Sequence, residues 1–458
     1  MCVDTRARTA TPIRCVHLFV CGQASQLDVM SLGSDGYMKD VWLIKSRKRR
    51  IEQGHPWVFR NEIEKITGDP ATGDVVQVKN HQGHFLAQGF YHEASQIAVR
   101  VVNYSEKEKV DDRFLREKMK QAWQHRKRVL RHTASCRAIY GEADGLPGLV
   151  VDKYEQVAVV QILSAAMDKR KEAIVKAIVD VLGVKAVYER SDAPVRQLEG
   201  LELSSGCLYG ECPSSVTIKE NGLQLEVNLV EGQKTGHFFD QRENRAAIAP
   251  FVRFSTEEKP RPDQHYDEQK AHLAAESTRV GATVLDCFSH TGAFAMHALM
   301  YGAAHVTLVD SSEVALSQAK INAELNGYLD RASFEVVNAF DYLRQAEQEK
   351  QQFDVVILDP PAFAKHKKAV DQALKGYKEI NLRGLKLVKD GGFLVTASCS
   401  SPVTRQEWLE VIHDAAMDAH KLLRMIEYRS AGKDHPQLLG MPENDYLKFA
   451  IFEVKSRG

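Results

Sequence analysis

Acidic residues stand at the ends of three successive apolar segments in the last third of the sequence. Asp286 ends TVLD, Asp310 ends HVTLVD, and Asp341 follows the next segment within NAFDYL. Ligands of parallel α/β sheets bind beyond the carboxyl ends of the strands, so we expect these residues to face one ligand. Asp310, at the second segment, is placed to accept both hydroxyls of a ribose. The alternative is that each aspartate only caps a helix.

Small residues follow the first of these segments, in LDCFSHTGAF. They let the backbone approach a ligand closely, and a helix that begins there favours a carboxylate at its N-terminus. Residues after the third segment could flank an adenine, with Asp341 or a backbone N–H at its exocyclic edge. The residues predicted to bind this nucleoside ligand are Asp286, Phe288, Ser289, Thr291, Gly292, Asp310, Asn338, Ala339 and Phe340. The pattern is not the GxGxxG of dinucleotide-binding proteins.

A cysteine and a further aspartate lie on the same predicted rim. The fourth segment ends in DPPAF, with Asp359, and the fifth ends in TASCS, with Cys399. A thiolate that adds to C6 of cytosine turns C5 into an enamine-like carbon that can attack a methyl donor, and loss of the C5 proton then expels the thiol. Asp359 could support the addition by hydrogen bonding near N3 of a single-stranded or flipped base. The alternative is that Cys399 is a small buried hydrophobic residue.

The elements that must position these residues form a regular series. TVLDCF, HVTLVD, SFEVVN, FDVVILD and GFLVTASC alternate with helical stretches, which predicts an α/β fold with a buried parallel sheet and right-handed crossovers. Two more segments, LLRMIEYRS and YLKFAIFEV, follow without a long helix between them. The sequence therefore predicts an antiparallel finish to the sheet.

The N-terminal third contains two basic stretches. Residues 41–110 alternate short apolar segments with turns, which predicts a small all-β module. This module carries a basic run made of Lys45, Arg47, Lys48, Arg49 and Arg50. A helix is predicted at 113–132, where Arg126, Lys127 and Arg128 belong to a second candidate phosphate-binding surface. Each stretch either contacts RNA or is only a solvated face.

The middle stretch, 113–225, mixes strands with helices and has no catalytic signature. Glu142, Asp144 and Asp152 could indicate a metal or acid–base site, but the glycines and proline of the same segment favour a structural turn. Residues 254–279 are polar and are predicted to be a surface insertion or linker. Residues 1–37 are predicted to be a disordered extension, with a cleaved presequence as the alternative.

Bulk properties limit the possible functions. The chain has 458 residues, a length that predicts about three domains. Lys+Arg and Asp+Glu both total 61, so any attraction to RNA must be local. No run approaches the roughly 18 apolar residues that cross a bilayer, so no membrane is expected. The eight cysteines form no CxxC pair and join no histidine cluster, so we expect no metal and a reduced, cytoplasmic setting.

From about residue 41 to the end, except 254–279, the chain resembles the bacterial 23S rRNA (cytosine-5) methyltransferase family. The segments that carry the resemblance are GEADGLPGLVVDKY, KTGHFFDQRENR (234–245), LDCFSHTGAF, DPPAF with GYKEIN (376–381), SCS and MPENDYLK (441–448). The resemblance implies a PUA-like RNA-binding β-barrel at 41–110 and a central α+β domain at 113–225. It also implies a Rossmann-like class I methyltransferase domain at 226–458, with a seven-stranded, mostly parallel sheet. S-adenosylmethionine is the implied cofactor and large-subunit rRNA the implied partner.

The resemblance also assigns roles to residues. It implies that Cys399 is the nucleophile and that Phe238, Gln241 and Arg242 lie near the cofactor, in a stretch that the residues alone would predict to be a loop. Cofactor contacts are implied around Asp286, Phe288, Gly292, Asp310, Asn338 and Asp359. Better-known RNA cytosine-5 methyltransferases carry a second cysteine in a Pro-Cys pair after the fourth strand. Here that place is Pro361-Ala362, so the base that removes the C5 proton is unassigned.

Three other functions stay open. A guanine-N7 or exocyclic-amine RNA methyltransferase would not need Cys399. A small-molecule methyltransferase would not need residues 1–110, and a non-enzymatic RNA-binding or assembly factor would not depend on Asp310. A homodimer also stays open.

Overall fold

The computed structural model describes residues 39–46, 50–230, 232, 235–253 and 281–457. The predictions for 1–37, for 254–279 and for Arg47, Lys48 and Arg49 lie outside the described residues. The described residues form two compact units. Within them, the first unit takes in the part up to Val216 together with Val227–His237 and Asp434–Met441, and the second takes in Thr217–Glu226, the part between Phe238 and Lys433, and the part from Pro442 onward. Among the described residues, no helix has the length and hydropathy of a membrane-spanning helix.

The first unit begins with a six-stranded sheet in the order β2-β6-β5-β4-β1-β3. Its strands are β1 (Asp40–Leu43), β2 (Trp57–Phe59), β3 (Ile63–Thr67), β4 (Val75–Lys79), β5 (Phe85–Tyr91) and β6 (Ile97–Asn103). Neighbouring strands are antiparallel except β1 and β4. Apolar residues alternate along them, so that Val41, Leu43, Val76 and Val78 point into one buried core. The prediction of a small all-β module is confirmed.

A second sheet of the same unit follows, in the order β11-β10-β9-β8-β7. Its elements are α1 (Asp112–Val129), β7 (Ser135–Tyr140), β8 (Leu149–Tyr154), β9 (Val157–Ile162), α2 (Ala165–Asp168), α3 (Lys171–Leu182), β10 (Ala186–Ser191) and β11 (Ser204–Tyr209). The Asp111 side chain caps α1 by accepting the Phe114 N–H at 3.0 Å. Leu115 and Met119 of α1 pack with Ile174 and Ile178 of α3 in the core of this sheet.

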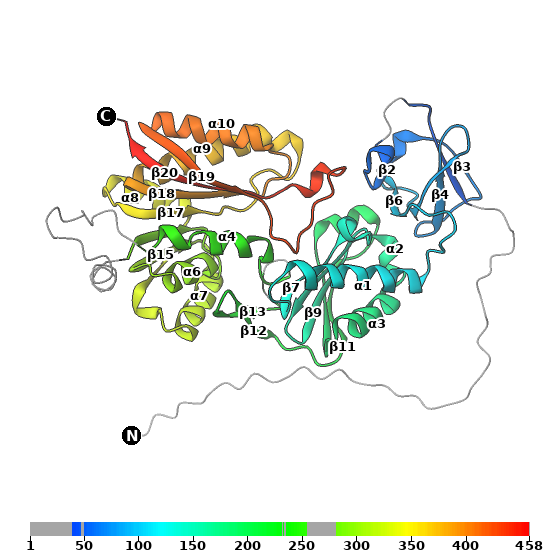
Figure 1. The fold of residues 1–458 in the computed structure, drawn as a ribbon, viewed down its shortest axis with the longest axis horizontal. Helices are drawn as coiled ribbons and strands as arrows, with labels where there is room; N and C mark the ends of the chain where they lie inside the picture. The colour runs from blue at the N-terminus through cyan, green and yellow to red at the C-terminus, as the bar shows by residue number, and fades with distance from the viewer. Residues whose placement is uncertain (1–38, 47–49, 231, 233–234, 254–280, 458) are drawn as a thin grey trace, which may run out of the picture. The chain divides into compact units, whose positions relative to one another are not determined.

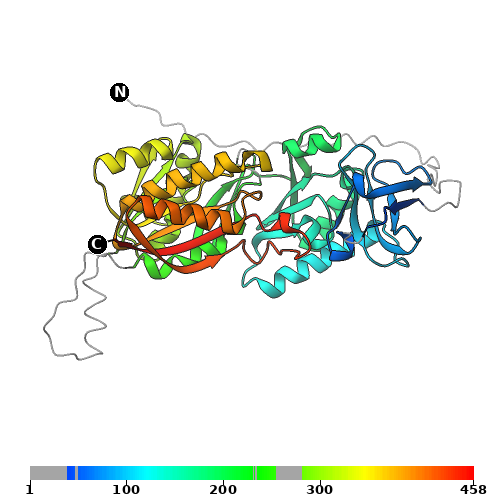
Figure 2. The same ribbon diagram turned by 90° about the horizontal axis from the view of Figure 1, so that it is seen from above.

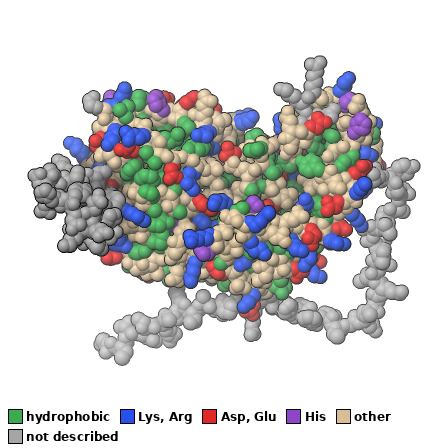
Figure 3. All heavy atoms as spheres, in the orientation of Figure 1, with side chains coloured by type: hydrophobic (Ala, Val, Ile, Leu, Met, Phe, Trp, Pro, Cys, Tyr) green, Lys and Arg blue, Asp and Glu red, His purple; other side chains and the backbone are tan. Residues whose placement is uncertain are grey.

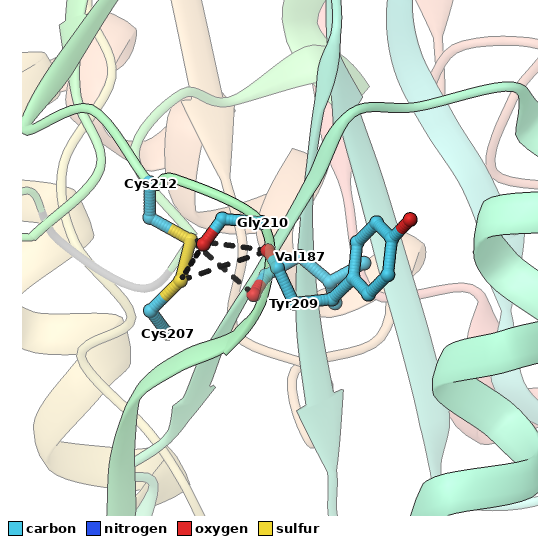
Figure 4. The surroundings of a disulfide bond; sticks show 5 residues. All are labelled: Val187, Cys207, Tyr209, Gly210 and Cys212. Atoms are coloured by element: carbon cyan, nitrogen blue, oxygen red, sulfur yellow. Dashed lines mark hydrogen bonds between the residues drawn. A yellow bond between two sulfur atoms is a disulfide. The ribbon is translucent and has the colours of Figure 1, made fainter. Parts of the chain in front are cut away.

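Two cysteines of the first unit are joined. Cys207, in β11, forms a disulfide with Cys212, and their Cα atoms lie 5.9 Å apart (Figure 4). The expectation of reduced cysteines is therefore wrong for this pair. Cys207 lies within β11 and Cys212 follows its end, with a sequence separation of 5, so the bond closes a short loop.

The boundary between the units is not at one point of the sequence. The hairpin of β12 (Ser215–Glu220) and β13 (Leu223–Asn228) carries the chain from the first unit into the second and back. Residues Asp434–Met441 also return to the first unit, where Asp434 Oδ2 accepts the Arg137 N–H at 3.0 Å. The predicted division at residues 225 and 226 is therefore too simple.

The second unit is built on a seven-stranded sheet in the order β16-β15-β14-β17-β18-β20-β19. Its strands are β14 (Thr283–Cys287), β15 (His305–Asp310), β16 (Ala332–Val336), β17 (Phe353–Leu358), β18 (Val388–Ser398), β19 (Lys421–Arg429) and β20 (Lys448–Ser456). The first five strands are parallel, and β20 is antiparallel to both β18 and β19. The predicted parallel sheet and its antiparallel finish are confirmed.

Helices cover both faces of this sheet. They are α4 (Arg242–Ala247), α6 (Ala293–Met300), α7 (Glu313–Leu325), α8 (Ala339–Gln348), α9 (Val370–Leu387) and α10 (Arg405–Asp418). Helices α8, α9 and α10 lie on one face, and α4, α6 and α7 lie on the other (Figures 1 and 2). This doubly wound arrangement brings the carboxyl ends of β14 to β18 to a single edge of the sheet.

Candidate active site

The turn after β14 has an unusual backbone. Phe288, His290 and Gly292 all have positive φ, at 62°, 50° and 76°. Two of these are not glycine, and such conformations are strained unless the surroundings hold them. At Gly292 a Cβ atom would lie only 2.9 Å from the Leu308 side chain, so the turn packs closely on β15. The close packing seen here is against β15, and the predicted close approach of the backbone to a ligand stays a prediction.

Aspartates hold this turn in place. Asp310, at the end of β15, accepts the His290 N–H at Oδ2 and the Ser312 N–H at Oδ1, both at 2.9 Å. Asp286 is 1% exposed, and its Oδ2 accepts the Ala295 N–H in the first turn of α6 at 3.1 Å. Asp286 therefore agrees in part with the alternative that each aspartate only caps a helix. Each carboxylate oxygen has two lone pairs, so Asp310 keeps acceptor capacity for a ligand.

Three carboxylates meet at the ends of β14, β15 and β17, and we call Asp286, Asp310 and Asp359 the strand-end cluster. Gln241 Nε2 donates to Asp359 Oδ1 at 2.9 Å. Burial raises the pKa of Asp286 well above its ordinary value, and the negative charges of Asp359 and then Asp310 raise it further. Concentrated negative charge in a buried place favours a ligand that carries positive charge and hydroxyl donors.

The end of β16 carries a different kind of group. The Asn338 side chain caps α8 by accepting the Phe340 N–H at 2.9 Å. Asp341 is 64% exposed in its side chain and pairs with Arg344 at 3.0 Å. Asp341 is therefore a surface residue on α8 and does not join the strand-end cluster.

Aromatic rings line the same edge of the sheet. The rings of Phe288 and Phe340 lie edge to face at 6.2 Å, and Phe340 contacts Phe363 of the DPPAF segment at 5.9 Å. Phe363 in turn lies 4.7 Å from Tyr377 of α9. Distances are between ring centroids. Such a row provides flat apolar surfaces on which a planar base can stack.

The two thiols at this edge differ in access. Cys399, directly after β18, is half-buried, and its Sγ lies 3.7 Å from the Pro360 carbonyl oxygen. Cys287, at the end of β14, is fully buried. Burial and then the charge of Asp286 raise the pKa of Cys287 well above its ordinary value. Of these two thiols, Cys399 is the one that a substrate can reach.

The segment that leads into α4 and includes its first residue, Arg242, supplies two of its three predicted residues to this edge. The Phe238 ring lies 5.3 Å from the His290 ring of the β14 turn, and Gln241 contacts Asp359. Arg242 instead lies 3.6 Å from Glu220 and over the Phe239 ring. The residues alone could not predict that this segment lies near the strand ends, because the segment is far from those strands in the sequence.

The remaining predicted ligand-binding residues lie on the same turn and helix. Ser289 is buried, the Thr291 carbonyl accepts from Asn322 Nδ2 at 3.0 Å, and Ala339 is buried in the first turn of α8. The structure thus brings together Asp286, Phe288, Ser289, Thr291, Gly292, Asp310, Phe340, Asp359 and Cys399 at the carboxyl edge of the sheet.

The basic residues predicted to bind RNA do not share one environment. Lys45, Arg50, Lys127 and Arg128 are exposed. Arg126 is 0% exposed and donates to Asp144 Oδ1 at 2.5 Å and to the carbonyls of Arg137 and Asp434. The prediction that Arg126 binds a phosphate is therefore wrong, because its guanidinium is buried and hydrogen-bonded inside the first unit.

The other acidic residues singled out in the sequence are paired. Glu142 contacts Arg100 at 3.2 Å, Asp144 contacts Arg126, and Asp152 accepts two hydrogen bonds from Arg137. These pairs support the interpretation of the 141–154 segment as a structural turn. Among the described residues, no group of His, Cys, Asp or Glu could hold a metal ion.

Comparison with known proteins gives consistent results along the chain. A PUA-like domain model matches residues 41–104, and a methyltransferase domain model matches residues 278–437. The "Ribosomal RNA large subunit methyltransferase I" of Alteromonas mediterranea is 39% identical over 417 residues, which cover 90% of this chain and 98% of that protein. The protein of the same name from Pseudoalteromonas translucida is 38% identical and covers 90% of this chain and 99% of that one.

Solved structures resemble the fold. A SAM-dependent methyltransferase from Streptococcus mutans matches 91% of this chain and 100% of its own, with 20% identity and a TM-score of 0.72. The structure of the methyltransferase SMU.776, complexed with SAH, matches the same shares with a TM-score of 0.73. At this identity the likeness concerns the fold, and it supports a class I methyltransferase sheet with a PUA-like domain.

Proposed function

Because the chain belongs to the ribosomal RNA large subunit methyltransferase I family, we propose that it methylates carbon 5 of a cytosine in 23S rRNA, with Cys399 as the nucleophile. The family makes the protein an S-adenosylmethionine-dependent methyltransferase of large-subunit rRNA. The observation that carries the finer proposal is the place of Cys399. Its half-buried sulfur lies against Pro360, next to Asp359 of the strand-end cluster.

The strand ends fit S-adenosylmethionine. Two buried polar atoms there, Asp286 Oδ1 and Ser289 Oγ, have no hydrogen-bond partner among the described residues, and buried polar atoms ordinarily have one. The carboxylates suit a positively charged ligand, and Asp310 keeps acceptor sites for ribose hydroxyls. When bound, the cofactor supplies a methyl group on a positively charged sulfur. The residues proposed to hold it are Asp286, Phe288, Ser289, Thr291, Gly292, Asp310, Asn338, Ala339, Phe340, Asp359, Phe238 and Gln241.

Cys399 is proposed to activate the base. Its thiolate adds to C6 of the cytosine, and the electron pair of the C5–C6 double bond becomes available at C5 for bond formation with the methyl carbon. A base then removes the C5 proton, the C5–C6 double bond re-forms, and the C6–sulfur bond breaks to release Cys399. We propose that Asp359 supports the addition by hydrogen bonding near N3. The row of Phe288, Phe340 and Phe363 offers surfaces against which the flipped base can stack.

RNA is proposed to contact the first unit. Its six-stranded sheet corresponds to the PUA-like match, and exposed Lys45, Arg50, Lys127 and Arg128 offer charges for phosphates. On the face drawn in Figure 3, lysine and arginine side chains are interspersed with acidic ones, and the net charge of the chain is zero. RNA attraction must therefore come from such local groups.

The test is Cys399→Ala with Cys287→Ala as the matched control. Large-subunit rRNA from cells that lack the gene is incubated with each purified protein and cofactor, and its nucleosides are measured by mass spectrometry. We expect the wild type and Cys287→Ala to restore one 5-methylcytidine, and Cys399→Ala to restore less than about one part in a thousand of the wild-type rate. Cofactor binding by Cys399→Ala should stay within about threefold of the wild type.

A different methylated base would contradict the proposal. An unchanged 5-methylcytidine content, with 7-methylguanosine or an N-methylated base appearing and with Cys399→Ala fully active, would leave the fold and cofactor in place. It would exclude methylation of carbon 5 of cytosine and assign the protein to the guanine-N7 or exocyclic-amine class of RNA methyltransferases.

A further inference from the structure

Lys448, the first residue of β20, is a buried cation that the proposed reaction does not yet use. It is 2% exposed, although lysine is rarely buried to this extent. Its Nζ donates to the carbonyls of Ser400 and Val403, both at 2.9 Å. These two carbonyls belong to the turn that directly follows Cys399, so the ammonium is bound to the nucleophile's own loop.

The residues on either side of Cys399 are also held. The Tyr377 hydroxyl lies 2.8 Å from the hydroxyls of both Ser398 and Ser400, and Ser400 Oγ accepts the Ala364 N–H at 3.0 Å. Ser398 and Ser400 are both 0% exposed. Cys399 is thus a half-exposed side chain on a fixed backbone, anchored by Tyr377 and Lys448.

The charges around the sulfur favour one role for the lysine. Cys399 interacts electrostatically with Lys448 and with Tyr377, and Asp359 is next to Pro360, which the sulfur contacts. Asp445 and Glu407 also act on Lys448. Within this set Lys448 is the cation. Burial lowers its pKa to about 8, against the opposing effects of Asp445, Cys399 and Glu407, so it is still mostly protonated at neutral pH.

We propose that Lys448 is a positioning residue for the nucleophile, which fixes the Cys399 loop and stabilises the thiolate form of Cys399 by its positive charge. The proposal rests on the proposed function, in which Cys399 attacks the base. A thiolate needs a nearby cation or helix terminus to be populated at neutral pH. A lysine that served only to tie the loop would hold the same two carbonyls but would not affect the ionisation of the sulfur.

The experiment measures ionisation directly in the full-length protein. Iodoacetamide reacts with thiolates, and the alkylation rate of the Cys399 peptide is followed by mass spectrometry from pH 5 to 10. For the wild type we expect a midpoint below the ordinary thiol value of about 8.5. In Lys448→Met the midpoint should rise by about one pH unit, which makes alkylation at pH 7 about tenfold slower. Lys448→Arg, which keeps the charge, should stay close to the wild type.

Lys389→Met is the matched control. Lys389 is a partly buried lysine near the start of β18, at the opposite end of the strand that leads to Cys399, and it lies 3.4 Å from Asp354. Its replacement should leave the Cys399 alkylation profile unchanged. Circular dichroism and cofactor affinity check that each variant is folded.

Two results would overturn the proposal. One is a wild-type midpoint at or above about 8.5, which decides the question even if Lys448→Met does not fold. The other is a folded Lys448→Met protein with the wild-type profile. Because alkylation needs neither RNA nor cofactor, it separates this proposal from the proposed function, which fails only if Cys399→Ala still forms 5-methylcytidine or no 5-methylcytidine is formed.

Discussion

Two groups of carboxylates, one in each unit, have opposite surroundings. In the first unit, Arg126 contacts Asp144, Arg137 contacts Asp152, and Arg100 contacts both Glu142 and Glu199. In the second unit, the strand-end cluster brings like charges together, and the pKa of Asp286 is raised by the charges of Asp359 and Asp310. One arrangement neutralises the carboxylates, and the other leaves them electrostatically unfavourable.

The difference separates structural acids from ligand-binding ones. A buried carboxylate with a guanidinium partner has its hydrogen bonds and its charge satisfied by the protein itself. A cluster of carboxylates that raises the pKa of one of its members lowers the stability of the free protein, and a positively charged ligand offsets this cost when it binds. Acidic residues occur in both units, and their partners distinguish the two roles.

The largest expected effect is on stability, from breaking one of the arginine–carboxylate pairs of the first unit. Asp144→Ala leaves the guanidinium of Arg126 buried with its charge uncompensated, and it also removes the acceptor of the Tyr140 N–H. We expect the free energy of unfolding of the first unit to fall by about 3–5 kcal/mol in urea denaturation. Cofactor affinity should not change. As a control, Asp341→Ala removes the exposed pair with Arg344 and should cost less than about 1 kcal/mol. Equal losses of unfolding free energy in Asp144→Ala and Asp341→Ala would contradict the structural role assigned to the buried pairs.

Asp310→Ala should have the next largest effect, on binding. Each hydrogen bond to a charged group contributes roughly 1.5–3 kcal/mol, so loss of two ribose contacts should weaken cofactor binding by about 100-fold or more. Isothermal titration calorimetry with S-adenosylhomocysteine measures the change. Asp310→Asn keeps one side-chain acceptor, so its affinity for the cofactor should lie between those of Asp310→Ala and the wild type. An affinity within about threefold of the wild type would show that Asp310 only holds the turn at His290 and Ser312.

Asp286→Asn tests the cost of the strand-end cluster. Because the pKa of Asp286 is raised in the folded state, the folded protein keeps a proton that the unfolded chain loses above about pH 4. Stability therefore falls as the pH rises from there through the folded pKa. Asparagine removes this dependence and can still accept the Ala295 N–H. We expect the variant to be more stable than the wild type by about 1 kcal/mol at pH 7 and by little at pH 4. Unfolding measured across that range would contradict this if the difference did not vary with pH.

Local patterns predicted much of the second unit. Apolar runs that alternate with helical stretches indicated a parallel sheet, and the short link before the last run indicated its antiparallel finish. Aspartates directly after apolar runs could be placed at one edge because parallel strands end together. Lys448 shows the limit of this approach. Its strand lies between β18 and β19 and is buried on both faces, so a lysine there needs partners that only the fold reveals.

Arg126 shows why pairing could not be predicted. It follows Ala122 by four residues and Trp123 by three, and both are on the buried face of α1, so helical spacing did contain a signal for its burial. A count of basic residues treats all arginines alike and misses it. Its partners, Asp144 and the carbonyls of Arg137 and Asp434, lie outside α1, and Asp434 is 308 positions away in the sequence. Contacts of that kind depend on tertiary structure.

The smallest expected effect concerns the exposed neighbours of that arginine. Lys127 and Arg128 follow Arg126 on α1, but they are exposed and can contact a phosphate, whereas the buried Arg126 cannot. Single replacement of Lys127 or Arg128 by alanine should weaken RNA binding by about two- to fivefold and reduce the salt slope by about one, without loss of stability. Fluorescence anisotropy with an rRNA fragment at several salt concentrations measures both quantities. Lys378→Ala, which removes a surface lysine paired with Asp418 in the second unit, is the control. If Lys127→Ala and Arg128→Ala leave the salt slope unchanged, α1 contributes only a solvated face, and RNA attraction must come from the residues around Lys45 and Arg50.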